Sequence, residues 1–197
     1  MNRKTCLAAA VALALCGGAY GQTTGSEVQR DVDQQQRIEQ GLQSGQLSTG
    51  EAARLEGGEA KIDRMQQNAL KDGTLSPAEK ARIQNAQDAE SRAIYGDKHN
   101  AVTGNPASAS SQRMQADVQR NVNQQARIKQ GASSGALTNK ETASLEGGQA
   151  KVARKEAVAG ANGHVGAGEQ ARIQHSENVQ SARIYDKKHN AKVRSGA

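Results

Sequence analysis

Oxygen-bearing side chains recur between residues 68 and 79 with a spacing that suits a hard cation. Asn68, Asp72 and Glu79 stand at the first, fifth and twelfth positions of this segment, and Gly73 stands at the sixth. Calcium takes six or more oxygen ligands, and twelve-residue loops supply them from positions 1, 3, 5, 7, 9 and 12. A weak calcium site with Asn68, Asp72 and Glu79 as ligands is therefore one hypothesis for this chain.

Helix capping is the competing interpretation of the same segment. The segment is distantly similar to an EF-hand loop, but its third position is Leu70, which offers no side-chain oxygen. Ser76 and Glu79 also have the spacing of a capping box, with Pro77 at the first helical position. Because capping explains these residues without a metal, we favour it and expect no cofactor.

Motifs for catalysis are missing from the sequence. It has no nucleophile elbow, phosphate loop or paired acidic motif. It also has no Trp and no Phe, and its two cysteines are Cys6 and Cys16. This composition excludes an aromatic-lined pocket and a disulfide framework, and we expect the protein not to be an enzyme.

The amino-terminal segment has the pattern of a secretory signal peptide. Arg3 and Lys4 precede an apolar run over residues 7–15, and small residues follow before Gln22. The run is too short to span a bilayer. We therefore assign residues 1–21 to a signal peptide and expect a periplasmic or secreted protein. A lipoprotein anchored through Cys16 is the less favoured alternative, because Leu15 is not a small residue.

An internal duplication organises the rest of the chain. Residues 28–101 align without a gap on residues 118–191 at an offset of 90, with 36 identities in 74 positions. Residues 102–117, which begin with small and polar residues and are broken by Pro106, are predicted to be a flexible linker. The predicted organisation is therefore a first repeat over 22–101, this linker, a second repeat over 118–191 and a tail over 192–197.

Each repeat is predicted to form three helices, so the fold class is all-α, with two tandem three-helix units. Val28, Val32, Ile38 and Leu42 fall on one face of a helix, and Leu55 and Ile62 begin a seven-residue stripe typical of a coiled coil. A glycine lies three residues before each expected helix start, at the place where the preceding helix should end in a left-handed residue. These glycines are Gly45, Gly73, Gly135 and Gly163.

Large apolar side chains are few, and this scarcity argues for loosely packed units with disordered termini. The glycine pairs inside the second helix of each repeat point the same way, because each glycine costs up to about 1 kcal/mol relative to alanine. We therefore expect a kink or break at Gly57-Gly58 and at Gly147-Gly148.

Charge is divided unevenly between the two halves. Residues 26–101 carry 10 basic and 13 acidic side chains, whereas residues 112–197 carry 14 and 7. One hypothesis is self-association through the oppositely charged halves. Another is that the basic second repeat binds an anionic surface, including peripheral contact with the cell envelope. No specific nucleic-acid partner is expected, because no aromatic residues interleave the basic ones.

Several motifs resemble those of small exported proteins of Gram-negative bacteria, which usually carry one such unit after a signal peptide. The motifs are Arg37-Ile38-Glu39-Gln40-Gly41, Ser44-Gly45-Gln46-Leu47-Ser48, Ser91-Arg92-Ala93-Ile94-Tyr95 and Lys98-His99-Asn100-Ala101. The resemblance implies secretion and a helical unit. We therefore expect an exported, non-enzymatic helical protein with a structural, interaction or envelope-stress role.

Overall fold

The computed structural model describes residues 19–192, and this part of the chain is helical and contains no strand. The predicted all-α class with two three-helix units is confirmed. Residues 1–18 of the predicted signal peptide and residues 193–197 of the predicted tail lie outside the described part. The helices are α1 (Ala19–Ser44), α2 (Thr49–Leu70), α3 (Pro77–Lys98), α4 (Ala109–Ser134), α5 (Asn139–Ala159) and α6 (Ala167–Lys188), with a 3-10 turn at Gly160–Asn162.

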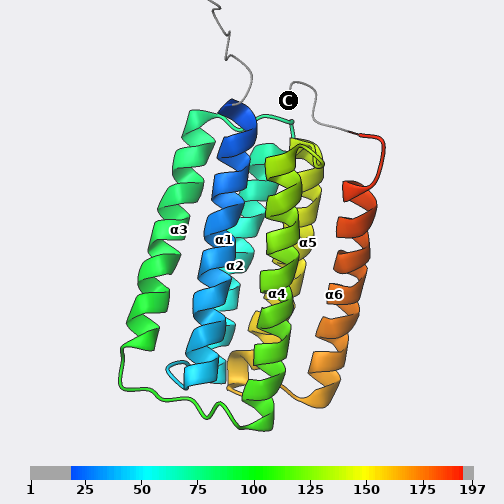
Figure 1. Cartoon of the computed structure of the whole chain (residues 1–197). Coiled ribbons are helices and arrows are strands. Elements are labelled where there is room, and N and C mark those ends of the chain that lie inside the picture. Colours follow the sequence, from blue (N-terminus) through cyan, green and yellow to red (C-terminus); the bar gives the residue numbers. More distant parts are fainter. Residues whose placement is uncertain (1–18, 193–197) are drawn as a thin grey trace, which may run out of the picture.

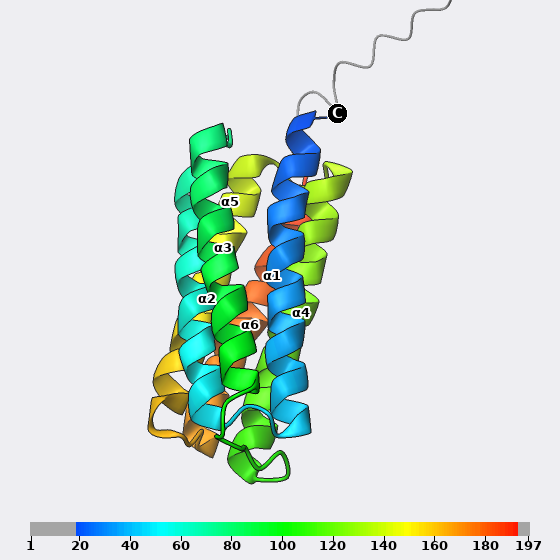
Figure 2. The same ribbon diagram turned by 90° about the vertical axis from the view of Figure 1, so that its left-hand side faces the viewer.

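The helices form one elongated bundle. α1, α2, α4 and α5 make its centre, and α3 and α6 flank it on opposite sides (Figure 1). The first unit, α1–α3, faces the viewer in Figure 2, with the second unit, α4–α6, behind it. α1 runs antiparallel to α4 and α2 antiparallel to α5, and these two pairs make the most extensive contacts between helices. None of the described helices is long and apolar enough to cross a membrane.

The turns follow the predicted chemistry. Gly45, Gly73, Gly135 and Gly163 all have positive φ, between 74° and 100°. Side chains of Ser48, Ser76 and Thr138 accept hydrogen bonds from the backbone N–H of a glutamate three residues later. The side chain of that glutamate accepts from the backbone N–H of the capping residue. The turn before α6 has Gly166 at this position, so only the glutamate half of the capping box remains.

Two apolar clusters close the ends of the bundle. One joins Ile38, Leu42 and Leu47 of the first unit to Met114 and other residues of the second. The other, at the opposite end, contains Val28 together with residues of the second unit, namely Ile128, Leu137, Leu145 and Ile184. Both clusters contain residues from both units, so the two units share one core.

Two expectations about the arrangement are wrong. The linker is shorter than residues 102–117, because α4 already begins at Ala109. Ser108 supplies the side-chain cap of that helix. The linker also lies against the first unit, where the Gly104 amide donates to the Gly45 carbonyl at 2.8 Å. Nor is the packing loose between the units, because α1 and α2 each bury one face against α4 and α5.

The expected break at the glycine pairs is also wrong, since α2 and α5 run through Gly57-Gly58 and Gly147-Gly148 without interruption. Neighbouring side chains occupy the space that a methyl group would need. A Cβ on Gly58 would overlap the Glu90 carboxylate, and one on Gly148 would overlap the Gln180 amide. The cost of a helical glycine is therefore offset by close packing of polar side chains against the backbone.

Two glycines on this interface should respond oppositely to alanine. A Cβ on Gly57 would lie 3.6 Å from the Ala157 Cβ, an ordinary contact, so Gly57→Ala should stabilise the fold by up to about 1 kcal/mol. A Cβ on Gly160 would lie only 2.6 Å from the Ala53 Cβ, and Gly160→Ala should destabilise it by about 1–3 kcal/mol. Urea unfolding of the two variants at one pH measures both effects. Changes of the same sign would contradict the packing.

Candidate functional site

The three residues of the predicted calcium site lie around the α2–α3 turn, and both of their carboxyl groups accept local hydrogen bonds. Asn68 is exposed on α2. The Asp72 Oδ1 accepts from the Thr74 amide at 2.9 Å and from its hydroxyl at 3.0 Å. The Glu79 Oε2 accepts from the Ser76 amide at 3.0 Å and hydroxyl at 2.6 Å. These hydrogen bonds lower the pKa of both carboxyl groups.

Glu79 separates the two interpretations, because capping and calcium need different things from it. Glutamine keeps an oxygen that can accept from the Ser76 amide, whereas a twelfth-position calcium ligand must bind with both carboxylate oxygens. We expect Glu79→Gln to unfold near the wild-type temperature with or without calcium, and titration calorimetry to find no micromolar calcium binding. Micromolar binding by the wild type that disappears in Glu79→Gln would restore the calcium site.

A different set of acidic residues lies in the centre of the bundle. We call it the carboxyl layer, and its members are at most 2% exposed: Asp31, Glu56, Glu59, Asp63, Glu146 and Glu156. They come from α1, α2 and α5. Within residues 19–192, ion pairs join Arg30 to Asp88, Arg54 to Asp97, Lys80 to Glu27 and Arg120 to Glu177. None of these pairs includes a member of the carboxyl layer.

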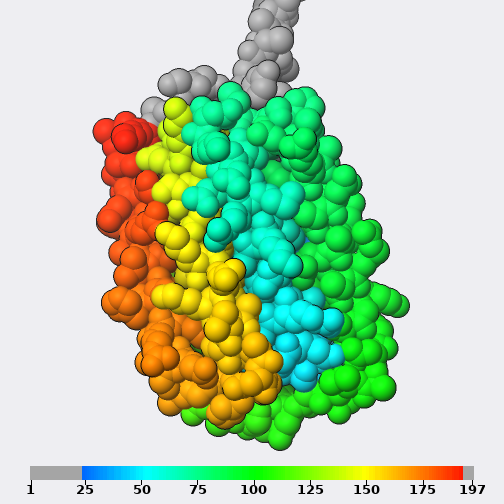
Figure 3. Space-filling view, turned by 180° about the vertical axis from the view of Figure 1, so that it is seen from behind, coloured from blue at the N-terminus to red at the C-terminus, as the bar shows by residue number. Residues whose placement is uncertain are grey.

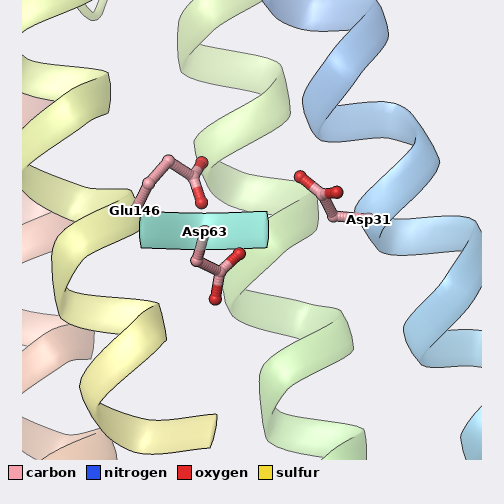
Figure 4. Close-up of side chains that lie close together, drawn as sticks. All are labelled: Asp31, Asp63 and Glu146. Atoms are coloured by element: carbon pink, nitrogen blue, oxygen red, sulfur yellow. The ribbon is translucent and has the colours of Figure 1, made fainter. Parts of the chain in front are cut away.

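Asp63 of α2 and Glu146 of α5 form the first acid pair of the layer. One oxygen of each lies within 4.8 Å of the other, and a hydrogen bond between the two carboxyl groups requires that one of them carry a proton. The Gln125 amide of α4 donates to both, at 3.1 Å to the Asp63 Oδ1 and 3.1 Å to the Glu146 Oε2. Asp31 of α1 completes a triad whose ligand oxygens lie within 4.8 Å of one another (Figure 4).

Glu56 of α2 and Glu156 of α5 form the second acid pair, and both lie against one amide of α4. The Asn121 amide of α4 donates to the Glu156 Oε2 at 2.6 Å and lies 3.4 Å from the Glu56 Oε2. The Gln35 amide of α1 donates to the same Glu56 oxygen at 3.0 Å. Two buried acid pairs, each contacted by an amide of α4, therefore lie between α2 and α5.

Two further hydrogen bonds each join one carboxyl group to one amide, at positions 90 apart, but the two units supply the acid and the amide in opposite order. Asp31 accepts from the Gln66 amide at 2.6 Å, and Asn121, ninety residues after Asp31, donates to Glu156 at the same distance. The acid of one unit is thus the amide of the other, and the hydrogen bond is kept. Each bond has one carboxyl and one amide, which avoids a further pair of facing acids.

Burial raises the pKa of every member of the layer. Loss of hydration raises the pKa of Asp31 and of Glu56 to about 7, and of Glu146 to about 8. The pKa values of Glu59, Asp63 and Glu156 lie well above their usual range for the same reason, and neighbouring carboxylates raise them further. Both Glu59 oxygens are buried without a hydrogen-bond donor, so this group also favours its neutral form.

Basic side chains offset this effect only weakly. Arg30 lowers the pKa of Asp31 and Arg37 lowers that of Glu59, but burial is the larger influence on both groups. Towards α6, Arg120 pairs with Glu177 at 3.1 Å, yet burial still raises the pKa of Glu177 to about 8. The centre of the bundle therefore favours neutral carboxyl groups.

Asp31, Asp63 and Glu146 are the residues best placed to hold a metal ion, but their hydrogen bonds suit protons better. Amide N–H groups of Gln66 and Gln87 point at the two oxygens of Asp31, at 2.6 and 2.7 Å. A cation on those oxygens would face the positive end of each N–H dipole. The site can therefore take up and release protons, and its burial closes it to a substrate.

Sequence reasoning missed the layer because no short motif marks it. Its members sit inside the apolar stripes: Asp31 lies three residues after Val28 and seven before Ile38, and Glu59 lies between Leu55 and Ile62 at helical spacing. Acidic residues at core positions of a helix were the available signal. Comparison with protein-family models, curated proteins and solved structures finds no match to this chain.

Proposed function

We propose that this is an exported, non-enzymatic helical protein whose fold is stabilised by acid, with an envelope-stress role under acidic conditions. The observation that supports it most is the carboxyl layer, in which six buried acids have no ion-pair partner among the described residues. Such groups are neutral in the folded state at a pH where they ionise in the unfolded chain. An exported protein meets external pH more directly than a cytoplasmic one.

A non-enzymatic role is supported by the closed position of these carboxyl groups. A catalytic acid or base must reach the atom with which it exchanges a proton. The groove between α5 and α6 and a smaller cavity between α1 and α4 are not lined by members of the carboxyl layer. The layer can thus act through the stability of the fold rather than on a bound substrate.

Export can be tested on the protein in its cell. If residues 1–21 are a signal peptide, mass spectrometry of the periplasmic fraction should find a chain that begins within a few residues of Gln22. Arg3→Glu with Lys4→Glu should reduce export, because the positive start of the signal is lost. A cytoplasmic chain that begins at Met1 would contradict export, and a diacylglycerol-modified Cys16 would show that the protein is a lipoprotein.

The proposed role is tested by acid challenge. Cells that lack the protein should lose viability faster than wild-type cells in acid and equally fast at neutral pH. Restoring the wild-type chain should rescue them in acid, and a chain with Glu56, Glu146 and Glu156 replaced by glutamine should rescue them equally well, because glutamine keeps these positions neutral. Equal survival of all strains in acid would contradict the role.

A further inference from the structure

A groove runs between α5 and α6 on the face shown in Figure 3, where the two helices lie side by side. Its volume is about 1040 Å³, close to that of sites for small organic ligands. It extends on α5 from Gly148 to Ala159, about 16 Å at 1.5 Å per residue. Val152 and Ile173 are buried among its lining residues, whereas Val158 and Val179 are 68% and 49% exposed.

The groove combines this apolar lining with positive charge. Five basic residues line it, Lys151, Arg154, Lys155, Arg172 and Arg183, against the single carboxylate of Glu169. Glu169 already accepts from the Gly166 amide at 2.8 Å. Lys151, Arg154, Lys155 and Arg172 are exposed. Lys155 already donates to the Ser176 hydroxyl and Arg183 to Ser144, and the basic residues lie along the whole groove. The lining therefore complements an amphiphile that carries negative charge.

The corresponding positions of the first unit have a different character. Ninety residues earlier, Val158 and Val179 correspond to Asn68 and Ala89, and Lys155 and Arg183 correspond to Met65 and Ala93. The second unit thus carries extra apolar side chains and extra basic side chains at one groove. In the groove these valines lie among basic residues, and this combination suits a ligand with an apolar chain and a negative charge.

We propose that the α5–α6 groove binds a single-chain anionic amphiphile, such as a fatty acid, with its chain along Val158 and Val179 and its anionic head among the basic residues. The volume suits one acyl chain with its head group. The carboxyl layer does not line this groove, so the proposal stands or fails independently of acid stabilisation. It gives the basic second unit a defined ligand in place of a general anionic surface.

Titration calorimetry with laurate below its micellar concentration, at about pH 6.5, tests the proposal on the chain without its signal peptide. We expect saturable binding of one laurate per chain. The variant Val158→Asn with Val179→Ala, which installs the first-unit residues, should weaken laurate binding at least about tenfold, because the methyl groups that the bound chain would cover are lost. Both valines are exposed, so the variant should keep the wild-type unfolding temperature.

Two controls separate the chain contact from the charge. Lys155→Met should weaken laurate binding several-fold and leave binding of neutral lauroylglycerol unchanged. Asn68→Val with Ala89→Val, which adds the same side chains to the first unit, should leave the laurate affinity and stoichiometry unchanged. Binding of equal strength in all variants, binding only to phosphatidylglycerol vesicles, or dimerisation that depends on Val158 and Val179 without laurate binding would each overturn the proposal.

Discussion

The unfolding temperature of this protein should fall steadily as the pH rises from about 4.5 to about 8. In the folded state, burial raises the pKa of Asp31 and Glu56 to about 7 and that of Glu146 to about 8. In the unfolded chain the same groups ionise near pH 4. Their stabilising contribution is therefore complete below about pH 4 and is lost as the pH rises through the folded-state pKa values.

Even one such group has a large effect. A shift of one pKa unit corresponds to about 1.4 kcal/mol. Because folding raises the pKa of Glu56 from 4.5 to about 7, ionisation of this group alone lowers the free energy of unfolding by about 3 kcal/mol between acid and neutral pH. That is a large fraction of the stability of a small domain. The acid pairs share protons, so we expect one broad transition rather than six separate ones.

Circular dichroism at a fixed ionic strength measures this directly. The helical signal should melt at a higher temperature at about pH 5 than at about pH 8, and the urea midpoint should fall in the same direction. Constant ionic strength separates titration from screening of the exposed ion pairs. A maximum of stability at or above neutral pH would show that the buried carboxyl groups are ionised in the native protein.

The variant Glu146→Gln should remove a large part of this pH dependence. In the wild type the Glu146 Oε2 accepts from Gln125, and a glutamine oxygen can take that place. The new NH2 group can then donate towards Asp63, which replaces the shared proton. We expect the free energy of unfolding to rise by about 2–4 kcal/mol at about pH 8 and to change by less than about 1 kcal/mol at about pH 4.5.

Asp33→Asn is the matched control for Glu146→Gln. Asp33 is exposed on α1, two residues after Asp31, and accepts from the Gln29 amide at 2.8 Å. Its removal deletes one negative charge without touching the buried layer. Its pH profile should therefore follow the wild type. If Glu146→Gln destabilises the protein equally at both pH values, the acid pair does not hold a proton.

Local chemistry made the turns predictable from the sequence. In the pattern of these turns a glycine is followed three positions later by Ser or Thr and three positions after that by Glu. It favours the end of one helix at the glycine and the capped start of the next helix. The predicted capping box of Ser76 and Glu79 and the four predicted glycine turns therefore form. The three-helix units followed from the spacing of residues such as Val28, Ile38 and Leu55.

The association of the units was harder to predict, because it depends on residues that hydropathy counts as surface. With Asp31, Glu59 and Asp63 scored as polar, the apolar stripes look too narrow for a shared core. Buried amide partners and protons make those positions suitable for the interior. The glycine pairs were misjudged for a related reason, since helix propensity ignores the polar side chains that pack against Gly58 and Gly148.

Carbon-13 NMR titration of the side-chain carboxyl groups tests the central claim most directly, because it reports the protonation of each group in the folded protein. We expect carboxyl carbons with midpoints near or above pH 7 for Asp31, Glu56 and Glu146. Burial should also raise the pKa of Asp63 and Glu156 well above the usual range. Asp72 and Glu79, which accept hydrogen bonds at the α2–α3 turn, should titrate below their usual range. If every carboxyl group of the folded protein titrated below about pH 5, the buried acids would be ionised at neutral pH and the acid-stabilised fold would be refuted.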